Sequence, residues 1–172
     1  MSSELAACLL WIVLFFSAMA GLARSFVQEQ EAGTLLTLRL YGGGQAVLFG
    51  KMAFNVLLLY VVTALVIPLY IVLLDVEVRE WWIFATALLL GDTGIAAMAT
   101  LTALMVARSG AKGALFTVIT FPVLLPLFLA AITATAHALD GGGELSELLF
   151  LGCYDVVVVA AASLLFDYLW QD

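Results

Sequence analysis

Five long apolar stretches constrain this chain more than any other feature. A helix that crosses a bilayer needs about 20 consecutive, mostly apolar residues. Five segments meet that length: residues 5–23, 52–74, 82–106, 113–136 and 148–166. Their only acidic or basic residues are Asp92 and Asp155. Runs of this kind favour helices over strands, because each backbone amide in hydrocarbon must be satisfied within its own segment. The sequence therefore predicts an all-α, polytopic membrane bundle that forms a single domain.

Composition excludes several other classes of protein. Apolar residues make up 65% of the chain and charged residues 11%, so a water-soluble fold is excluded. A net charge of −7 leaves no basic surface that could bind nucleic acid. His137 is the only histidine, and Cys8 and Cys153 lie singly within apolar runs. We therefore expect no metal site built from protein side chains, no disulfide and no directly bound cofactor.

Basic residues set the expected orientation in the membrane. Five of the six lie in two of the links between spans: Arg24, Arg39, Lys51, Arg108 and Lys112. Basic residues are retained on the cytoplasmic side, so links 24–51 and 107–112 are expected inside the cell. The N-terminus and the links 75–81 and 137–147 are then expected outside. The first segment lacks the basic start of a secretory signal, and we expect it to remain as a helix.

The link between the first two spans has a pattern of its own, which predicts a short cytoplasmic coupling helix within residues 26–40. It combines polar residues that continue the first helix into water, a helix-ending glycine, a capping threonine and a run of leucines: Gln28, Glu29, Glu31, Gly33, Thr34, Leu35, Leu36 and Leu38. Glycine favours helix ends and threonine favours helix starts. So short a helix cannot bury all its leucines, which leaves some of them to face lipid headgroups or a partner protein. Composition alone favours neither a docking element nor a membrane anchor.

The motifs of this link resemble those of one transporter family. The pattern QExExGTL, followed by a leucine-rich turn and GKxxxN, is similar to ABC-2-type exporter permeases. More narrowly, the chain resembles the haem exporter protein B family, CcmB. The matching segments are residues 26–40 (FVQEQEAGTLLTLRL), 49–51 (FGK), 89–91 (LLG), 100–101 (TL), 121–127 (FPVLLPL), 154–157 (YDVV) and 165–172 (LFDYLWQD). The family has six membrane helices, and the resemblance implies that this chain begins at the second. It departs from the family at the Gly42-Gly43-Gly44 triplet and at Asp92.

The resemblance implies a permease subunit of the cytochrome c maturation system, in the bacterial inner membrane. The partners it implies are an ABC ATPase subunit, a haem-handling membrane subunit, a second permease copy and membrane lipid. Haem would be the cargo or handled substrate. The sequence holds no GxxxxGK[ST] phosphate loop, so ATP is expected on a partner chain and this chain is expected to be non-catalytic. A membrane assembly factor that transports nothing stays open as an alternative.

Asp92 and Asp155 lie inside predicted spans, where an ionisable residue suggests a functional site. The sequences Asp92-Thr93-Gly94 and Tyr154-Asp155 leave an intramembrane aspartyl hydrolase as a second alternative, although the GxGD form is absent because residue 89 is leucine. For Asp155 the resemblance favours a structural polar contact between helices, which is worth little energy. The role of Asp92 stays open.

Two further features fall in the fourth span. Pro122 and Pro126 lie one turn apart, and each removes a backbone hydrogen bond, so we expect a bend there. The bend is either static or different between transport states. His137 lies at the outer end of the same span, beside Asp140. It is either a haem ligand or a solvated polar side chain.

Overall fold

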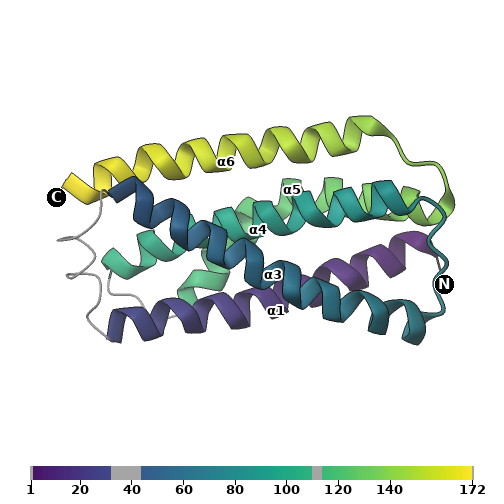
Figure 1. Ribbon diagram of the computed structural model, residues 1–172, viewed down its shortest axis with the longest axis horizontal. Helices are drawn as coiled ribbons and strands as arrows, with labels where there is room; N and C mark the ends of the chain where they lie inside the picture. Colours follow the sequence, from purple (N-terminus) through teal and green to yellow (C-terminus); the bar gives the residue numbers. More distant parts are fainter. Residues whose placement is uncertain (1, 32–43, 110–113, 172) are drawn as a thin grey trace.

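The computed structural model describes residues 2–31, 44–109 and 114–171. Every regular element within these ranges is an α-helix: α1 (Ser3–Glu31), α3 (Gly44–Leu74), α4 (Trp81–Ser109), α5 (Ala114–Asp140) and α6 (Leu145–Gln171). Figure 1 shows them as one elongated bundle, with the two ends of the chain at opposite ends of it. Each helix contains a stretch long and apolar enough to cross a membrane. The predicted all-α membrane bundle is thereby confirmed.

The apolar spans agree closely with the predicted segments, but the helices run beyond them. Within the described residues the spans are Ser3–Leu22, Leu48–Leu74, Trp81–Thr102, Thr120–Asp140 and Leu145–Leu164. Helix α1 continues past its span to Glu31, as the polar residues 28–31 predicted, whereas α3 begins at Gly44, ahead of the predicted start at residue 52. Hydropathy marks only the part of a helix that suits hydrocarbon, whereas a helix continues wherever its backbone hydrogen bonds do. The expected short coupling helix lies outside the described residues.

Helix α4 is the centre of the bundle. It contacts each of the other four helices, and 72% of its span is buried, against 17% for α3. The buried face of α4 carries small residues that let neighbouring backbones approach closely: Ala87, Gly91, Gly94, Ala96, Ala97 and Ala99. Membrane helices associate through such close contacts, because lipid is as apolar as their side chains. The small residues of α4 therefore explain its central place.

Tight turns join the helices at one end of the bundle. Asp75 follows α3 with a φ of 49°, and the amide of Val76 donates to the carbonyl of Ile71 at 3.4 Å. Gly141 follows α5 with a φ of 83°, and its amide donates to the carbonyl of His137 at 2.9 Å. Left-handed residues of this kind satisfy the last carbonyls of a helix and turn the chain back.

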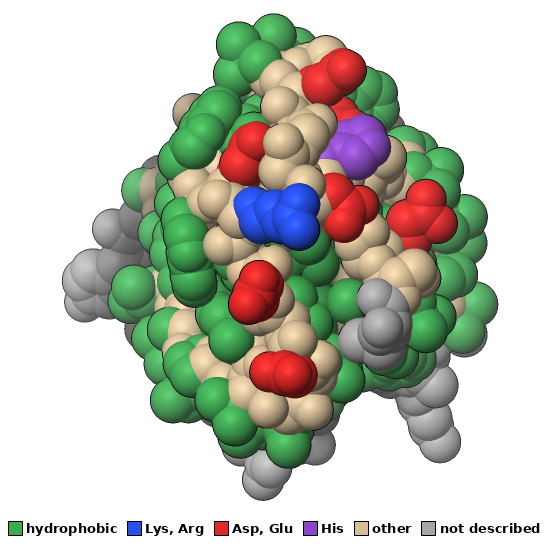
Figure 2. All heavy atoms as spheres, turned by 90° about the vertical axis from the view of Figure 1, so that its right-hand side faces the viewer, with side chains coloured by type: hydrophobic (Ala, Val, Ile, Leu, Met, Phe, Trp, Pro, Cys, Tyr) green, Lys and Arg blue, Asp and Glu red, His purple; other side chains and the backbone are tan. Residues whose placement is uncertain are grey.

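The two ends of the bundle differ in charge. We call the end at these turns the acidic end, and Figure 2 shows it directly. Its charged residues are Glu4, Asp75, Glu77, Glu80, Asp140, Glu144 and Glu147, together with Arg79. The opposite end, which we call the basic end, carries the basic residues Arg24 on α1, Lys51 on α3 and Arg108 on α4, together with the acids Glu29, Glu31 and Asp167. This separation agrees with the predicted orientation, in which the acidic end lies outside the cell.

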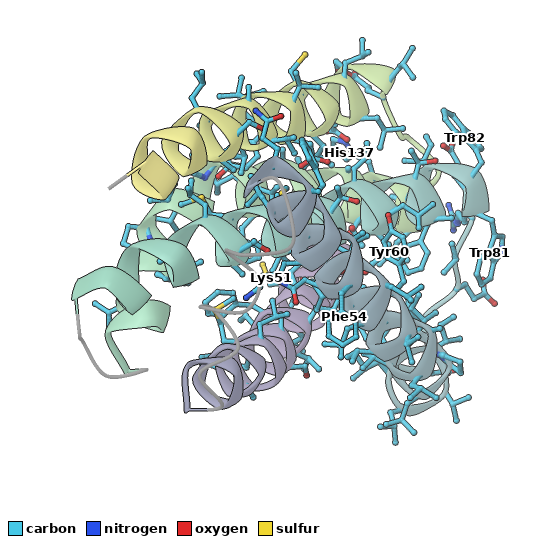
Figure 3. All side chains as sticks on the ribbon, turned by 60° about the vertical axis from the view of Figure 1, so that its left-hand side comes forward. Lys51, Phe54, Tyr60, Trp81, Trp82 and His137 are labelled. Carbon is cyan, nitrogen blue, oxygen red and sulfur yellow. The ribbon has the colours of Figure 1, made fainter. Side chains whose placement is uncertain are left out.

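Tryptophans mark the acidic boundary of the span. Trp81 and Trp82 begin α4, and their side chains are 57% and 59% exposed. Figure 3 shows both projecting outward from that end of the bundle. Tryptophan is enriched where hydrocarbon meets headgroups. These two residues therefore place a membrane boundary near the start of α4.

Candidate functional site

Asp92 is a buried acid that links α4 to α3. It is 1% exposed, and the hydroxyl of Thr63 on α3 donates to its Oδ2 atom at 2.6 Å. The other oxygen, Oδ1, has no hydrogen-bond partner among the described residues. A membrane-interior carboxylate is costly unless it is paired. The Thr63 contact satisfies part of that requirement and holds the two helices together.

Asp155 is the second interior acid, and it faces a different side of α4. It lies on α6, is 7% exposed, and has no hydrogen bond to either carboxylate oxygen within the described part of the chain. Its Oδ1 atom lies against Gly94 of α4, where a Cβ atom would be 2.5 Å away. The glycine thus makes the room that the carboxylate occupies. A side chain on Gly94 would also overlap Leu127 of α5.

The contacts of the two acids lie on different sides of α4. Asp92 reaches α3, whereas Asp155 meets the Gly94 side of α4. Positions 92 and 94 are two residues apart in a helix, which turns their side chains about 200° away from each other. A shared proton between two carboxylates requires them to be about 3 Å apart. The arrangement therefore gives no support to the aspartyl hydrolase alternative.

The proline pair in α5 is braced by α6. Pro122 and Pro126 both lie inside α5, and the hydroxyl of Tyr154 on α6 donates to the carbonyl of Val123 at 2.7 Å. A proline ring weakens the hydrogen bonding of the preceding turn, and neighbouring helices supply replacement donors in a membrane. Tyr154 acts as such a donor. It lies next to Asp155, so two consecutive residues of α6 contact α5 and α4.

Three of the predicted coupling residues lie at the basic end. Gln28, Glu29 and Glu31 lie in the last turns of α1, beyond the apolar span that ends at Leu22. The other predicted residues, together with the helix they were expected to form, lie outside the described residues: Gly33, Thr34, Leu35, Leu36 and Leu38. Helix α1 therefore extends from the apolar span to the start of this segment.

The sequence did not predict several contacts between side chains. His137 pairs with Glu147, at 2.7 Å between Nδ1 and Oε1, whereas the sequence drew attention to its neighbour Asp140. Asn55 of α3 donates to Thr100 of α4 at 2.8 Å, with both side chains buried. Asn55 and Thr100 each belong to a motif that supports the resemblance to CcmB. These motifs indicated the two positions but did not predict that the two side chains contact each other.

These features define a helical, multi-pass membrane protein with polar contacts inside its spans and without a cluster of metal ligands in the described ranges. The model of the CcmB protein family matches residues 1–167. The chain belongs to the CcmB family, and is thereby a component of the haem-exporting ABC transporter system of cytochrome c maturation in the inner membrane. Comparison with curated proteins and with solved structures found no match to this chain.

Proposed function

We propose that the chain is the permease subunit of a transporter that exports haem or delivers it for cytochrome c maturation. A separate ATPase drives this transport and docks on residues 26–40. The observation that carries the docking site is the extension of α1. The helix continues to Glu31, although its apolar span ends at Leu22. About 13 Å of helix, at 1.5 Å per residue, therefore leads from the span into the segment proposed to bind the ATPase.

The other link at the basic end is too short for this role. In the order of the helices, one link joins α1 to α3 and the other joins α4 to α5. Helix α4 ends at Ser109 and α5 begins at Ala114, whereas Glu31 and Gly44 are separated by a much longer stretch. The longer connection also contains the glycine, threonine and leucine pattern. Residues 26–40 are therefore the better candidate for the ATPase contact.

A rigid α1 would carry movement from the ATPase into the bundle. Trp11 on α1 is 1% exposed, and its indole N–H donates to the hydroxyl of Thr135 on α5 at 3.0 Å. The same ring lies against Gly91 of α4. A shift of α1 would thus act on α4 and α5 together, and the proline pair provides a place for α5 to bend.

Two copies of the permease and surrounding lipid complete the proposed assembly. Helix α3 has the least buried span, and it presents outward-facing apolar side chains along its length: Leu57, Val61, Leu65, Leu69 and Val72. In a bilayer such a face meets either lipid or another membrane subunit. This face of α3 therefore provides apolar area for contact with lipid and with a second permease copy, both of which the resemblance implies.

Charge reversal at the end of α1 tests the proposal. We expect Glu31→Lys to weaken association with the ATPase by about 1 kcal/mol or more, roughly fivefold in affinity, because it opposes the charge that the partner meets. Gly33→Val should act in the same direction, since β-branched residues disfavour the helix-ending conformation expected of this glycine. The measurements are co-purification of the ATPase and the yield of cytochrome c in cells.

The matched control is Glu77→Lys, which makes the same charge change at an exposed position of the acidic end. It should leave the ATPase bound. If Glu31→Lys and Gly33→Val both keep the partner and full cytochrome c yield, residues 26–40 are a membrane anchor and the coupling proposal fails. If cytochrome c yield persists when the ATPase partner is catalytically dead, the assembly-factor alternative is favoured instead.

A further inference from the structure

Helix α3 donates hydrogen bonds to α4 at two levels of the span. The side-chain amide of Asn55 donates to Thr100 at 2.8 Å, and the hydroxyl of Thr63 donates to Asp92 at 2.6 Å. Thr100 donates its own hydroxyl proton to the carbonyl of Ala96 within α4, so it acts towards α3 as an acceptor. In both pairs α3 supplies the donor and α4 the acceptor.

Tyr60 adds a third contact of the same kind. Its hydroxyl oxygen lies 2.9 Å from Oγ1 of Thr93, and Thr93 donates its own proton to the carbonyl of Leu89 at 2.7 Å. The tyrosine is therefore the donor in its contact with α4. Figure 3 shows Tyr60 on the side of α3 that faces α4.

The contacts keep one antiparallel register. Residues 55 and 63 lie two turns apart on α3, and their partners 100 and 92 lie two turns apart on α4, which is about 12 Å along each axis. Leu59 lies between the two levels on the same face of α3 and is 1% exposed. Because α3 has the least buried span, single polar contacts matter more for its attachment than for that of a well-buried helix.

Asp92 is the acceptor whose needs these contacts leave unmet. It lies at the middle of the span Trp81–Thr102 and is 1% exposed. Its Oδ1 atom has no hydrogen bond within the described part of the chain. An ionised carboxylate accepts up to about four hydrogen bonds. A buried charge with so little compensation is costly enough that the group takes up a proton instead.

Basic side chains lie far from this acid. Among the residues of the five described spans, the basic ones are Lys51 on α3 and His137 on α5. Lys51 lies three turns before Thr63, about 18 Å along the helix. His137 lies at the acidic end, beside Glu147. Neither residue supplies the positive charge that would keep Asp92 ionised.

The other titratable groups of the neighbouring helices bring no positive charge either. Those that α3 and α6 carry in the middle of their spans are neutral or acidic: Tyr60, Tyr70, Tyr154 and Asp155. The middle parts of α1 and α5, residues 9–22 and 120–136, contain no titratable side chain. The surroundings of Asp92 therefore favour an uncharged acid from every side.

We propose that Asp92 is a proton-binding site within the span, and that the bound proton keeps α3 docked on α4. In the docked bundle the side chain is a neutral carboxylic acid that accepts from Thr63 through Oδ2 and carries the proton on Oδ1. When this proton leaves for water, the remaining carboxylate needs more donors than Thr63 alone. Helix α3 then separates from α4 far enough for water to reach the acid. The site depends neither on the cargo nor on the ATPase contact.

Docking of α3 should weaken as the pH rises. The docked form binds one proton more than a form in which the acid is hydrated and ionised, so the docking constant falls by about tenfold for each pH unit. Asp92→Asn keeps a neutral oxygen that accepts from Thr63 but cannot titrate. Its docking should therefore be independent of pH.

Infrared spectra of the purified, full-length chain in lipid nanodiscs test the bound proton. An exposed aspartate is ionised throughout roughly pH 5 to 8. In this range we expect the parent protein to show a C=O stretching band of a neutral carboxylic acid that Asp92→Asn lacks. Thr63→Val should keep this band and shift it to higher frequency, because the C=O group loses its hydrogen bond. A parent spectrum without an Asp92-dependent acid band would overturn the site.

Thiol labelling tests the link between the proton and docking. A cysteine placed at Leu59, in a chain whose Cys8 and Cys153 are replaced by alanine, reacts with a membrane-permeant maleimide only when α3 separates from α4. The labelling rate is divided by the rate of the same chain carrying Asp92→Asn, which cancels the ionisation of the thiol itself. We expect this ratio to rise by about tenfold for each pH unit. A ratio independent of pH would show that the proton does not control docking.

Asp75→Asn is the matched control. It makes the same substitution at an exposed carboxylate directly after α3, where the φ of 49° suits asparagine. It should leave the acid band and the labelling ratio as they are in the parent. If Asp75→Asn and Asp92→Asn change both readouts equally, the effect is general electrostatics and the proposed site is wrong.

Discussion

Trp11 packs directly against Gly91 in the interior of the bundle. A Cβ atom on Gly91 would overlap the six-membered ring of Trp11. The ring is also fixed by its hydrogen bond to Thr135 and by a tilted contact with Phe128, at 6.5 Å between ring centroids. The sequence marks Gly91 as part of a motif, but it cannot reveal which residue fills the space above it.

Gly91→Ala should therefore destabilise the protein by about 1–3 kcal/mol, the usual cost of an extra methyl group in a filled core. Gly152→Ala is the matched control, because Gly152 lies within α6 and a Cβ there meets nothing within 4 Å. We expect that control to be neutral or slightly stabilising. Unfolding in mixed detergent measures both, and equal stability of the two variants would contradict the assignment of Trp11 to this space.

At the scale of the helices, α4 contacts several neighbouring helices through residues that lie close together in its sequence. Asp92 contacts α3, Gly94 makes room for Asp155 of α6, and Gly91 receives Trp11 of α1. These residues lie within four positions, so the turn of the helix distributes them to different neighbours. Asp92 thus joins two helices through Thr63, whereas both carboxylate oxygens of Asp155 lack a hydrogen-bond partner among the described residues.

Replacing the acids separates this explanation from catalysis. Asp92→Asn keeps an oxygen that can accept from Thr63, so we expect assembly and cytochrome c yield to persist. Asp92→Leu leaves the Thr63 hydroxyl unpaired and should cost about 1–2 kcal/mol. Asp155→Asn should affect mainly the stability of the bundle. Purified protein that cleaves a helical peptide only when Asp92 is present would contradict this account.

Hydropathy predicted the five helices because a bilayer imposes a minimum apolar length on each span. The polar residues 28–31 predicted the extension of α1, but the sequence did not predict that α3 begins at Gly44, ahead of its apolar span. The pairing of the helices was not predictable, because packing in lipid depends on small residues and single polar contacts such as Asn55 with Thr100. The His137–Glu147 pair depends likewise on a turn whose geometry follows from Gly141.

At the scale of the whole molecule, the separation of charge gives the bundle a direction. The acidic end carries the His137–Glu147 pair, while the basic end carries the extension of α1 towards residues 32–43. An inside-positive orientation would put the proposed ATPase contact in the cytoplasm.

Photo-cross-linking in native membranes tests the central claim, that residues 26–40 contact the ATPase. A photoreactive residue is placed at Leu36 in one variant and at Gly142, an exposed position of the acidic end, in another. We predict an adduct with the ATPase subunit from position 36, with a yield that changes when a non-hydrolysable ATP analogue is bound, and no such adduct from position 142. An ATPase adduct from position 142, or none from position 36, would contradict the account.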